Sequence, residues 1–575
     1  MGVWVYLNSL RGPFIVDDLY TIAWNFPLRN LSQIGKIAQQ NLFVGLGIDS
    51  SYFRPLTQLS FALDFYVWGL NPVGFRLTGL ALHLANAVLI FFLFRTFLSP
   101  SRSALVSLIF VVHPVNTQAI AYISSRSDPL FFFFTALTIY LWVTDKSTLR
   151  PFCLLFFLLG LLSKEPAVVT LPLILLTDLT RCESRNEIEG RLRSNWHWYI
   201  AFAGVLGAYL VLRLWVLDYP LLMKTELTGL TIPHRLFLAS TLLGKHFVLL
   251  FFPLNLAFVH VVSLTLDPFA PLVLGPLLAL IGLTYLALRL WKRERAIALG
   301  LGWFIISIFP ALNFSPLNLP LMESWLYLPG VGLFIMMVSL GGLLVKPKGL
   351  RLFAACVIVF LLTMRSIVRS ADWGNPVRLF EKNVQLYPGS DIAWSALAQA
   401  YSGTGREKES LEAIKRATEI RPDKWTSHYS LGLNYFLSDE DDKAEQAFLQ
   451  AIVQHPDIAW PHYALGISYF RSGLWEKARE EFMKADRSKL HIPMLYHVIG
   501  STYLALDKKE LAEQAFQNAL KEFPGKRKYH AGIHDGLGGL LIRKKRLEDA
   551  KREFNLALRF DPENKEAKEK LASLK

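Results

Sequence analysis

Cysteine and charge are both scarce in this sequence. Only three of its 575 residues are cysteines, and Cys153, Cys182 and Cys356 all lie in or beside apolar runs. So few cysteines exclude a disulfide framework and a cysteine-based metal site. Charged residues make up 18% of the chain, whereas hydrophobic residues make up 53%. This composition excludes a disordered chain and an ordinary single soluble domain.

Motifs that identify several common protein classes are also missing. The sequence contains no H-E-x-x-H metal-binding pattern, no glycine-rich phosphate loop before a helix and no nucleophile elbow. It has no stripe of basic residues with interleaved aromatics, so we expect no nucleic-acid partner.

The basic residues are unevenly distributed along the chain. Residues 1–371 carry 28 basic and 16 acidic side chains, while residues 372–575 carry 32 and 30. The excess falls in loops between apolar runs, where the positive-inside rule places cytoplasmic basic residues. We therefore predict a polytopic membrane domain over residues 1–371, a half-repeat connector over 372–390 and a polar domain over 391–575.

Ten apolar segments of the membrane-spanning type recur in the first domain. Several are shorter than the roughly 20 residues that a straight helix needs to cross a bilayer. Short helices are tolerated where protein lines a cavity, so we expect a helix bundle with an internal polar cavity. The segments are Pro72–Leu98, Ser103–Val112, Pro129–Thr144, Arg150–Leu162, Ala167–Leu179, Trp198–Leu217, Pro268–Trp291, Ala296–Leu312, Trp325–Val345 and Leu350–Arg369.

Basic loops predict the orientation of these segments. We interpret Arg235–Leu254, which carries Lys245 and His246 at its middle, as an interfacial or re-entrant helix on the outer side. The polar domain then lies outside the cytoplasm. It faces the periplasm if the membrane is a cell inner membrane, and the lumen if the membrane is that of the endoplasmic reticulum. The residues that we assign to cytoplasmic loops are Arg95, Arg102, Lys146, Arg150, Arg181, Arg185, Arg191, Arg193, Lys292, Arg293, Arg295, Lys346, Lys348 and Arg351.

The start of the chain leaves two alternatives. Only Gly2–Leu7 is apolar before the first polar loop, which is too short for a spanning helix. Either Pro72–Leu98 inserts with its N-terminus outside, or a further membrane helix precedes residue 1. We favour the second.

The polar domain repeats one pattern. Trp394, Leu397, Ala398 and Tyr401 begin a tetratricopeptide (TPR) register, whose unit is a hairpin of two helices over 34 residues. Small residues allow the two helices of a hairpin to approach closely, and aromatics fill the grooves. About five repeats and a charged end cap predict an α-solenoid that binds peptides or proteins. Glycine and phenylalanine recur in register at Gly432/Phe448, Gly466/Phe482, Gly500/Phe516 and, after an insertion at 525–528, Gly538/Phe554.

Five polar clusters interrupt the apolar domain, and the predicted topology places all five on the outer side. Ionisable groups at membrane depth are costly, so such groups are functional candidates. Asp17-Asp18, after an apolar lead-in, suits a general base whose pKa is raised by burial or by its neighbour. The alternative is a solvated turn or a helix cap. The other clusters contain the candidate substrate-binding residues Arg54, His113, Arg126, Lys164, Glu165, Glu323 and Tyr327.

Arg54, Arg126 and Lys164 are suited to binding a phosphate. Each candidate also has a local structural interpretation: an ion pair of Arg126 with Asp128, a helix cap at Lys164-Glu165, and an interfacial position for Tyr327. His113 precedes a proline at a helix end, where a structural role is the commoner one. His83 and Asn86, one helical turn apart, are expected to pair between helices.

Taken in order, these residues resemble the transmembrane-and-TPR-containing (TMTC) protein O-mannosyltransferases, a glycosyltransferase family of the GT-C type. The resemblance covers Asp17-Asp18, Tyr52–Leu56, His113–Asp128, Ser163–Glu165, Glu323–Pro329, Asp372-Trp373 and the repeats. It implies an all-α fold in which a polytopic GT-C-like helix bundle is followed by a TPR α-solenoid. The family pattern leads us to expect an acidic residue at position 118, and Gln118 departs from it.

The resemblance also implies an activity. Such enzymes take a sugar, here expected to be mannose, from a polyprenyl-phosphate-linked donor and act on the non-cytoplasmic face. Asp17 or Asp18 would be the base for a Ser or Thr hydroxyl of a protein acceptor that the TPR groove binds. We predict no metal ligands, although a divalent cation could assist the leaving group. The rival hypothesis is a membrane-anchored TPR scaffold without chemistry, and a lipid flippase is third.

Overall fold

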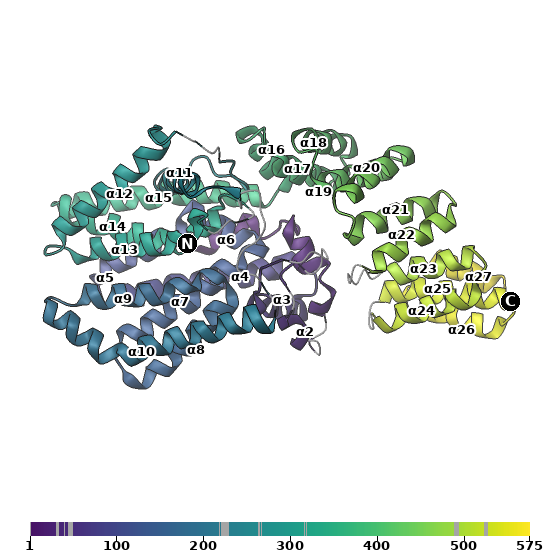
Figure 1. The fold of residues 1–575 in the computed structure, drawn as a ribbon, viewed down its shortest axis with the longest axis horizontal. Helices are drawn as coiled ribbons and strands as arrows, with labels where there is room; N and C mark the ends of the chain where they lie inside the picture. Colours follow the sequence, from purple (N-terminus) through teal and green to yellow (C-terminus); the bar gives the residue numbers. More distant parts are fainter. Residues whose placement is uncertain are drawn as a thin grey trace. The chain divides into compact units, whose positions relative to one another are not determined.

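The computed structural model describes residues 2–29, 31, 34–39, 41–43, 50–217, 219, 229–262, 265, 267–314, 317, 319–487, 494–522 and 527–574. Within these ranges the chain is helical and contains no β-strand (Figure 1), which confirms the all-α prediction. The chain forms two compact units, one extending to Ala400 and the other from Tyr401 onward. Two of the four residues of the predicted insertion at 525–528 lie outside the described residues.

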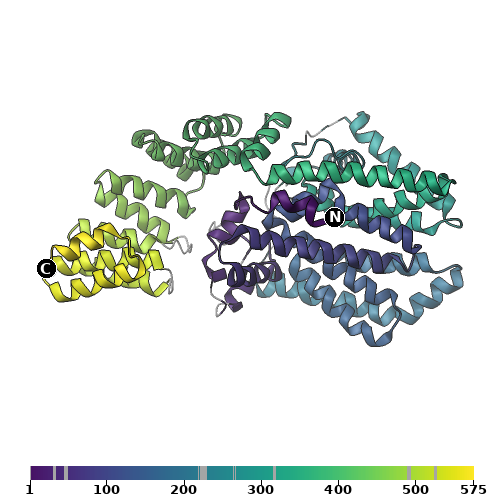
Figure 2. The ribbon, with the colours of Figure 1, turned by 180° about the vertical axis from the view of Figure 1, so that it is seen from behind.

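The first unit is a bundle of apolar helices. Figures 1 and 2 show that its long helices run side by side, with α2 and α3 at one end of the bundle. Its helices are α1 (Gly2–Tyr6), α2 (Ile34–Gln39), α3 (Pro55–Trp68), α4 (Pro72–Phe94), α5 (Pro100–Val112), α6 (Thr117–Ala121), α7 (Ser127–Val143), α8 (Arg150–Ser163), α9 (Thr170–Arg181), α10 (Arg185–Val211), α11 (Ile232–Phe251), α12 (Pro271–Leu290), α13 (Arg295–Ile308), α14 (Pro329–Leu344), α15 (Lys348–Trp373), α16 (Pro376–Leu386) and α17 (Asp391–Ser402).

Five helical segments of the described chain are long and apolar enough to cross a membrane. They are Pro72–Phe94, Arg185–Val216, Pro271–Leu290, Arg295–Leu312 and Lys348–Trp373. A bent pair, Pro100–Val112 with Pro114–Ala121, would add a sixth, and α8 and α14 are apolar but short. Several of the ten predicted segments are thus helices too short to be full spans by themselves. The helices make this a multi-pass membrane protein.

The last membrane helix leads directly into the connector. Only Gly374 and Asn375 separate α15 from α16, and the Asn375 side chain caps α16 by accepting from the Arg378 N–H. Asn383 on α16 accepts from the backbone N–H groups of Phe258 and Val259 at 2.9 Å each. The connector therefore packs with the membrane helices, and their compact unit extends past the predicted boundary at residue 371.

The second unit is built from helical hairpins. Neighbouring hairpins pack on one another through α20 and α21, α22 and α23, and α24 and α25, as expected of a solenoid. Its helices are α18 (Glu407–Ile420), α19 (Trp425–Leu437), α20 (Asp441–Gln454), α21 (Ala459–Arg471), α22 (Trp475–Arg487), α23 (Leu495–Ala505), α24 (Lys509–Glu522), α25 (Arg527–Arg543), α26 (Leu547–Phe560) and the end cap α27 (Lys565–Ala572).

Glycine allows the helices of each hairpin to cross closely. A Cβ atom added at Gly466 would lie 2.5 Å from the Phe482 ring, and one at Gly432 would lie 2.6 Å from the Phe448 ring. Both phenylalanines are fully buried. The repeated glycine is thus required because the phenylalanine of the second helix occupies the space that a side chain would need.

We expect Gly466→Val to destabilise the repeat unit by about 1–3 kcal/mol, because the added side chain displaces the buried Phe482 ring. The measurement is hydrogen exchange over α21 and α22 in the full chain, which should become faster. Gly539→Ala is the matched control, because nothing lies within 4 Å of a Cβ added at that helical position. Equal exchange in the two variants would contradict the packing argument.

Candidate active site

The predicted base residues lie in a buried loop that precedes a short helical segment. The Asp18 side chain is fully buried, and its carboxylate accepts from the Ser124 N–H at 2.8 Å and the Ser124 hydroxyl at 2.7 Å. It also accepts from the Ile15 N–H at 3.3 Å. A carboxylate with three donors is held in one orientation. Asp18 therefore anchors the loop to the segment around Ser124.

Asp17 is held differently. Its backbone N–H donates to the Tyr122 hydroxyl at 3.2 Å, and its carbonyl accepts from the Thr21 hydroxyl at 2.8 Å. Its side chain is only half-buried. The backbone contacts fix the position of Asp17, and the Tyr122 hydroxyl also interacts with its carboxylate.

Burial governs the protonation of both carboxylates. It raises the pKa of Asp18 to about 6, although the Ser124 hydrogen bonds and the charge of Arg76 oppose the rise. Burial also raises the pKa of Asp17, and the Tyr122 hydroxyl opposes that rise. A carboxylate with a raised pKa is a stronger base than one in water. The predicted effect of burial on this pair is therefore present in the structure.

The residue before the pair has an unusual backbone. Val16 has a φ of 46°, a left-handed conformation that β-branched residues rarely adopt. Its N–H donates to the Gln399 side chain at 3.2 Å. Gln399 lies on α17, the first TPR helix, so a repeat residue contacts the backbone beside Asp17. Strained backbone of this kind clusters at functional sites.

A second cluster joins the ends of α3, α7 and α8. Arg54 pairs with Glu165 at 2.9 Å, and Lys164 pairs with Asp128 at 2.5 Å. Burial would raise the pKa of Glu165, but Arg54 and Arg213 hold it below its usual value. Three cations face two carboxylates, so this cation cluster carries a net positive charge. Its members are Arg54, Asp128, Lys164, Glu165 and Arg213, which lies 3.6 Å from Glu165.

Arg126 does not share these partners. Its guanidinium pairs with Asp64 at 2.5 Å, donates to the Phe75 carbonyl at 2.6 Å and lies over the Phe61 ring. The local ion pair with Asp128 that the sequence left open is not formed, because Asp128 binds Lys164 instead. Asp64 compensates the Arg126 charge, so Arg126 lies outside the cation cluster that contains Arg54 and Lys164, the other two predicted phosphate ligands.

Glu323 forms a buried network between the membrane helices and the connector. It is fully buried and accepts from the Ala257 N–H at 2.6 Å. Its carboxylate also contacts His260 at 3.0 Å and Arg369 at 3.3 Å. His260 in turn bonds the Tyr387 hydroxyl at 3.0 Å, just after α16. Glu323 thus links the loop after α11, the last membrane helix and the connector.

Tyr327 and His113 are saturated by structural contacts. The Tyr327 hydroxyl lies 2.8 Å from His83 Nδ1 and 3.2 Å from Asn86 Nδ2, so the predicted pairing of these two α4 residues runs through it. His113 Nε2 bonds the Leu250 carbonyl at 3.0 Å, and its Nδ1 accepts from the Val115 N–H. The Tyr327 hydroxyl and both ring nitrogens of His113 are thus engaged within the protein, and this arrangement does not support the predicted substrate contacts.

Gln118 has a geometric reason to be an amide. Its Nε2 donates to the Phe258 carbonyl at 3.0 Å, while its Oε1 accepts from the Ser324 N–H at 2.9 Å. An ionised carboxylate accepts hydrogen bonds only, so it would leave the Phe258 carbonyl without this donor. The amide at this position joins two loops that flank Glu323.

The sequence interpretation missed Arg76, Arg213 and Arg369. Arg76 donates to the Pro13 carbonyl at 2.6 Å and the Ala121 carbonyl at 2.9 Å, so it ties the Asp17-Asp18 loop and the end of α6 to α4. The signal was available, because all three are charged residues inside or beside apolar runs. Tyr122 gave no such signal, since a tyrosine in an apolar segment is ordinary.

A cavity of about 580 Å³ lies beside the connector. Its polar lining includes Arg365, Asp372 and Lys382, and Lys382 pairs with Asp372 at 2.7 Å. The adjacent Trp373 stacks on Tyr122, which bonds Asp17, with ring centroids 5.9 Å apart. The cavity itself is not lined by Asp17 or Asp18. Among the described residues, no group of three or more His, Cys, Asp or Glu side chains is placed to hold a metal ion.

Comparisons with known proteins agree with the two-part architecture. Tetratricopeptide repeat family models match residues 392–424 and 497–565. Human protein O-mannosyl-transferase TMTC3 is 24% identical over 490 residues, covering 78% of this chain and 53% of that protein. Protein O-mannosyl-transferase F38B6.6 of Caenorhabditis elegans is 24% identical, and the match covers 72% of this chain and 61% of that protein. Human protein O-mannosyl-transferase TMTC4 is 25% identical, and the match covers 67% of this chain and 60% of that protein.

These matches extend well beyond the repeats. An alignment covering 78% of the chain must include much of the membrane domain, because the chain from Asp391 onward holds only residues 391–575. The chain spans about half to three-fifths of the length of these curated relatives. The resemblance inferred from the polar clusters is confirmed: over most of its length the chain is similar to TMTC protein O-mannosyltransferases, and it has a bundle of apolar helices followed by TPR repeats.

Proposed function

We propose that this protein is a membrane glycosyltransferase that moves mannose from a polyprenyl-phosphate-linked donor to a Ser or Thr hydroxyl of a protein acceptor. The observation that carries the proposal is the Asp17-Asp18 loop, in which one buried carboxylate accepts three hydrogen bonds and its neighbour is half-buried and positioned by backbone contacts. The named activity of the relatives supports the same chemistry. A TPR scaffold without chemistry would not need such a loop.

Asp17 is the base in this proposal, and Asp18 is a positioning residue. The Asp17 carboxylate takes the proton of the acceptor hydroxyl, and the oxygen forms a bond to the anomeric carbon of the sugar. The bond from that carbon to the phosphate oxygen breaks, its electron pair stays on the oxygen, and polyprenyl phosphate leaves. A single displacement inverts the anomeric centre.

The cation cluster supports binding of the donor phosphate. Arg54 exposes 11% of its side chain and its partner Glu165 exposes 25%, so both are within reach of a ligand. Arg54 and Arg213 share Glu165 as a carboxylate partner, and an arriving phosphate can compete for their guanidinium groups. The net charge of the cluster favours the dianionic product, polyprenyl phosphate, as it leaves.

We expect Arg54→Gln to raise the KM for the donor by about tenfold, with a smaller effect on kcat, because one charge-assisted hydrogen bond to phosphate is lost. The measurement is the initial rate of mannose transfer in membranes over a range of polyprenyl-phosphate mannose concentrations. Arg185→Gln is the control, because Arg185 is exposed and its ion pair is with Glu189, one helical turn away. An unchanged donor KM would remove Arg54 from the phosphate site.

The TPR repeats are proposed to bind the protein acceptor on the non-cytoplasmic side. The contact from Gln399 to the Val16 N–H supports a coupling between the first repeat helix and the catalytic loop. Sidedness is tested with Ser438→Cys, since Ser438 is exposed just after α19. A membrane-impermeant thiol reagent should label this variant, and not the unaltered chain, from the outer side of sealed vesicles. Labelling from the cytoplasmic side alone would overturn this arrangement.

A further inference from the structure

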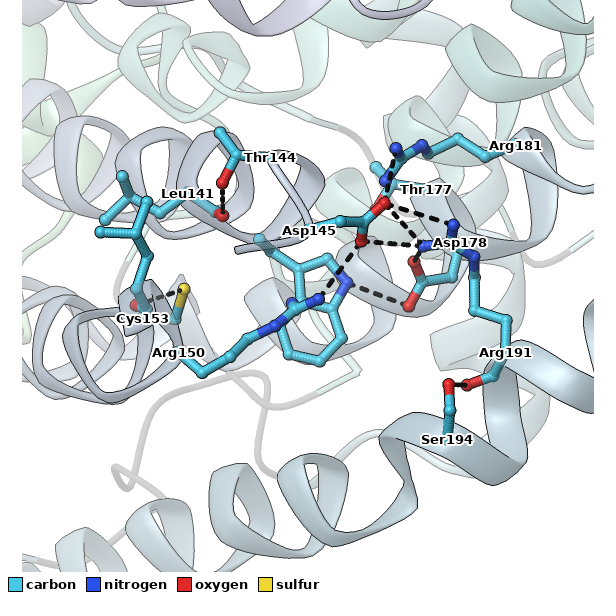
Figure 3. A network of polar contacts seen from close by, with 12 residues as sticks. Leu141, Thr144, Asp145, Arg150, Cys153, Thr177, Asp178, Arg181, Arg191 and Ser194 are labelled. Carbon is cyan, nitrogen blue, oxygen red and sulfur yellow. Dashed lines mark hydrogen bonds and ion pairs between the residues drawn. The ribbon is translucent and has the colours of Figure 1, made fainter. Parts of the chain in front are cut away.

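A separate cluster of charges lies at the opposite end of the α7–α8 hairpin from the cation cluster. α7 has 17 residues, so it is about 25 Å long, with Asp128 in its first turn and Asp145 just beyond its last residue. Arg150 begins α8, Asp178 and Arg181 lie in the last turn of α9, and Arg191 lies near the start of α10. We call these residues, Asp145, Arg150, Asp178, Arg181 and Arg191, the arginine cluster (Figure 3).

Asp145 is the centre of the arginine cluster. Figure 3 shows Arg150, Arg181 and Arg191 converging on its carboxylate, at 3.3, 2.8 and 3.1 Å. Its backbone has a φ of 56°, which aspartate and asparagine tolerate better than most residues. The turn between α7 and α8 therefore presents one carboxylate to three guanidinium groups.

The second carboxylate is already saturated. Asp178 is buried and accepts from the Trp142 indole at 2.9 Å, the Tyr199 hydroxyl at 2.7 Å and Arg191 at 3.1 Å. It has little capacity left for Arg150 or Arg181. Three guanidinium charges thus face two carboxylates, and the arginine cluster retains one positive charge that these carboxylates do not compensate.

Two buried guanidinium nitrogens lack an acceptor. Arg150 exposes only 5% of its side chain and lies over the Trp142 ring at 3.5 Å. Its Nη1, and the Nη1 of Arg181, are buried without a hydrogen-bond partner in the part of the chain that the structure describes. A buried donor left unpaired is costly, and a charged donor more so. An anion beside Asp145 would compensate the remaining positive charge of the cluster.

We propose that the arginine cluster is a binding site for a phosphate group, distinct from the donor site. A phosphate offers the several acceptor oxygens that converging guanidinium forks require. The cluster lies where apolar helices end, which is the depth of lipid headgroups, and anionic lipids bind basic sites there. The phosphate is carried either by an anionic lipid headgroup or by a free phosphate ion. This site is independent of the proposed sugar transfer.

Two substitutions that should change lipid affinity in opposite directions test the site. Arg181→Gln removes one guanidinium and should weaken retention of phosphatidylglycerol by about tenfold, the loss of one charge-assisted hydrogen bond. Asp145→Asn removes the competing carboxylate and should strengthen retention, while asparagine suits the left-handed backbone. Affinity is measured by native mass spectrometry of the full chain, titrated with phosphatidylglycerol or with phosphatidylcholine. Arg185→Gln, an exposed residue of the same region, is the matched control.

A merely structural cluster gives a different result. Both substitutions would then lower the unfolding temperature, and lipid retention would not move in opposite directions; that pattern overturns the proposal. Thermal unfolding of the unaltered chain adds a readout that needs no variant. Stabilisation by phosphatidylglycerol alone identifies a lipid headgroup, and stabilisation by inorganic phosphate identifies a free ion. No stabilisation by either overturns the site.

Discussion

Replacing Asp17 by asparagine is expected to lower mannose transfer by about 10²–10⁴-fold, which is the contribution of a positioned general base. Asparagine has the same shape and keeps the backbone bonds to Tyr122 and Thr21, so the loop should stay folded. The measurement is the initial transfer rate at saturating donor. Unfolding temperature, compared with that of the unaltered chain, shows whether the loss is chemical.

Asp18→Asn separates the two roles of the pair. The Asp18 carboxylate accepts from two N–H groups and one hydroxyl, and an amide nitrogen cannot accept such bonds. This variant should lose thermal stability as well as activity, whereas Asp17→Asn should lose activity alone. The reverse pattern, with a stable inactive Asp18→Asn and an active Asp17→Asn, would transfer the role of base to Asp18.

The burial of Asp17 and Asp18 also predicts how the transfer activity depends on pH. A general base must be deprotonated, so activity is lost as the pH falls through its pKa. Burial raises the pKa of Asp17 and that of Asp18, the latter to about 6. The acid limb of kcat/KM should therefore lie above the usual carboxyl range near 4. An acid limb at or below pH 4 would show that neither buried carboxylate limits the reaction.

The second large effect is expected at Arg369. Replacing Arg369 by methionine should destabilise the membrane unit by about 3–5 kcal/mol, because Glu323 would keep a buried charge without its cation. Arg369 exposes 1% of its side chain and Glu323 none. The measurement is the unfolding free energy of the full chain in detergent. The connector α16 should detach in the same variant, seen as faster hydrogen exchange over residues 376–386.

A compensating substitution provides the control. Adding Glu323→Gln to the Arg369→Met variant removes the orphaned charge, while the amide can still accept from the Ala257 N–H. The double variant should therefore be more stable than Arg369→Met alone. If the double variant is no more stable, the loss comes from packing rather than from the buried charge.

The fold was largely predictable because its signals are periodic or compositional. Apolar runs indicated the helix bundle, and the spacing from Gly432 to Phe448 indicated the TPR hairpins, whose crossing the structure explains by direct contact. The number of spanning segments was harder. A run such as Arg150–Leu162 has the composition of a span, but its helix has only 14 residues, and composition does not reveal how such a short helix lies in the bundle.

The sequence indicated candidate site residues but not how they pair. Asp17-Asp18 stands out as two carboxylates in an apolar region. The hydrogen bonds that hold Asp18 depend on Ser124, more than a hundred residues away. Arg54, Arg126 and Lys164 share a charge, yet Asp64 holds only Arg126. Such long-range partners follow from helix packing, which residue spacing does not encode.

The most direct test of the proposed function is transfer by the purified full chain in proteoliposomes, where no other transferase is present. Labelled polyprenyl-phosphate mannose is supplied with a protein acceptor rich in Ser and Thr. The account predicts protein-bound label that mild alkali releases from Ser or Thr, and no more than trace label with Asp17→Asn. Equal labelling by the unaltered chain and the folded Asp17→Asn variant, or none by the unaltered chain, would contradict it.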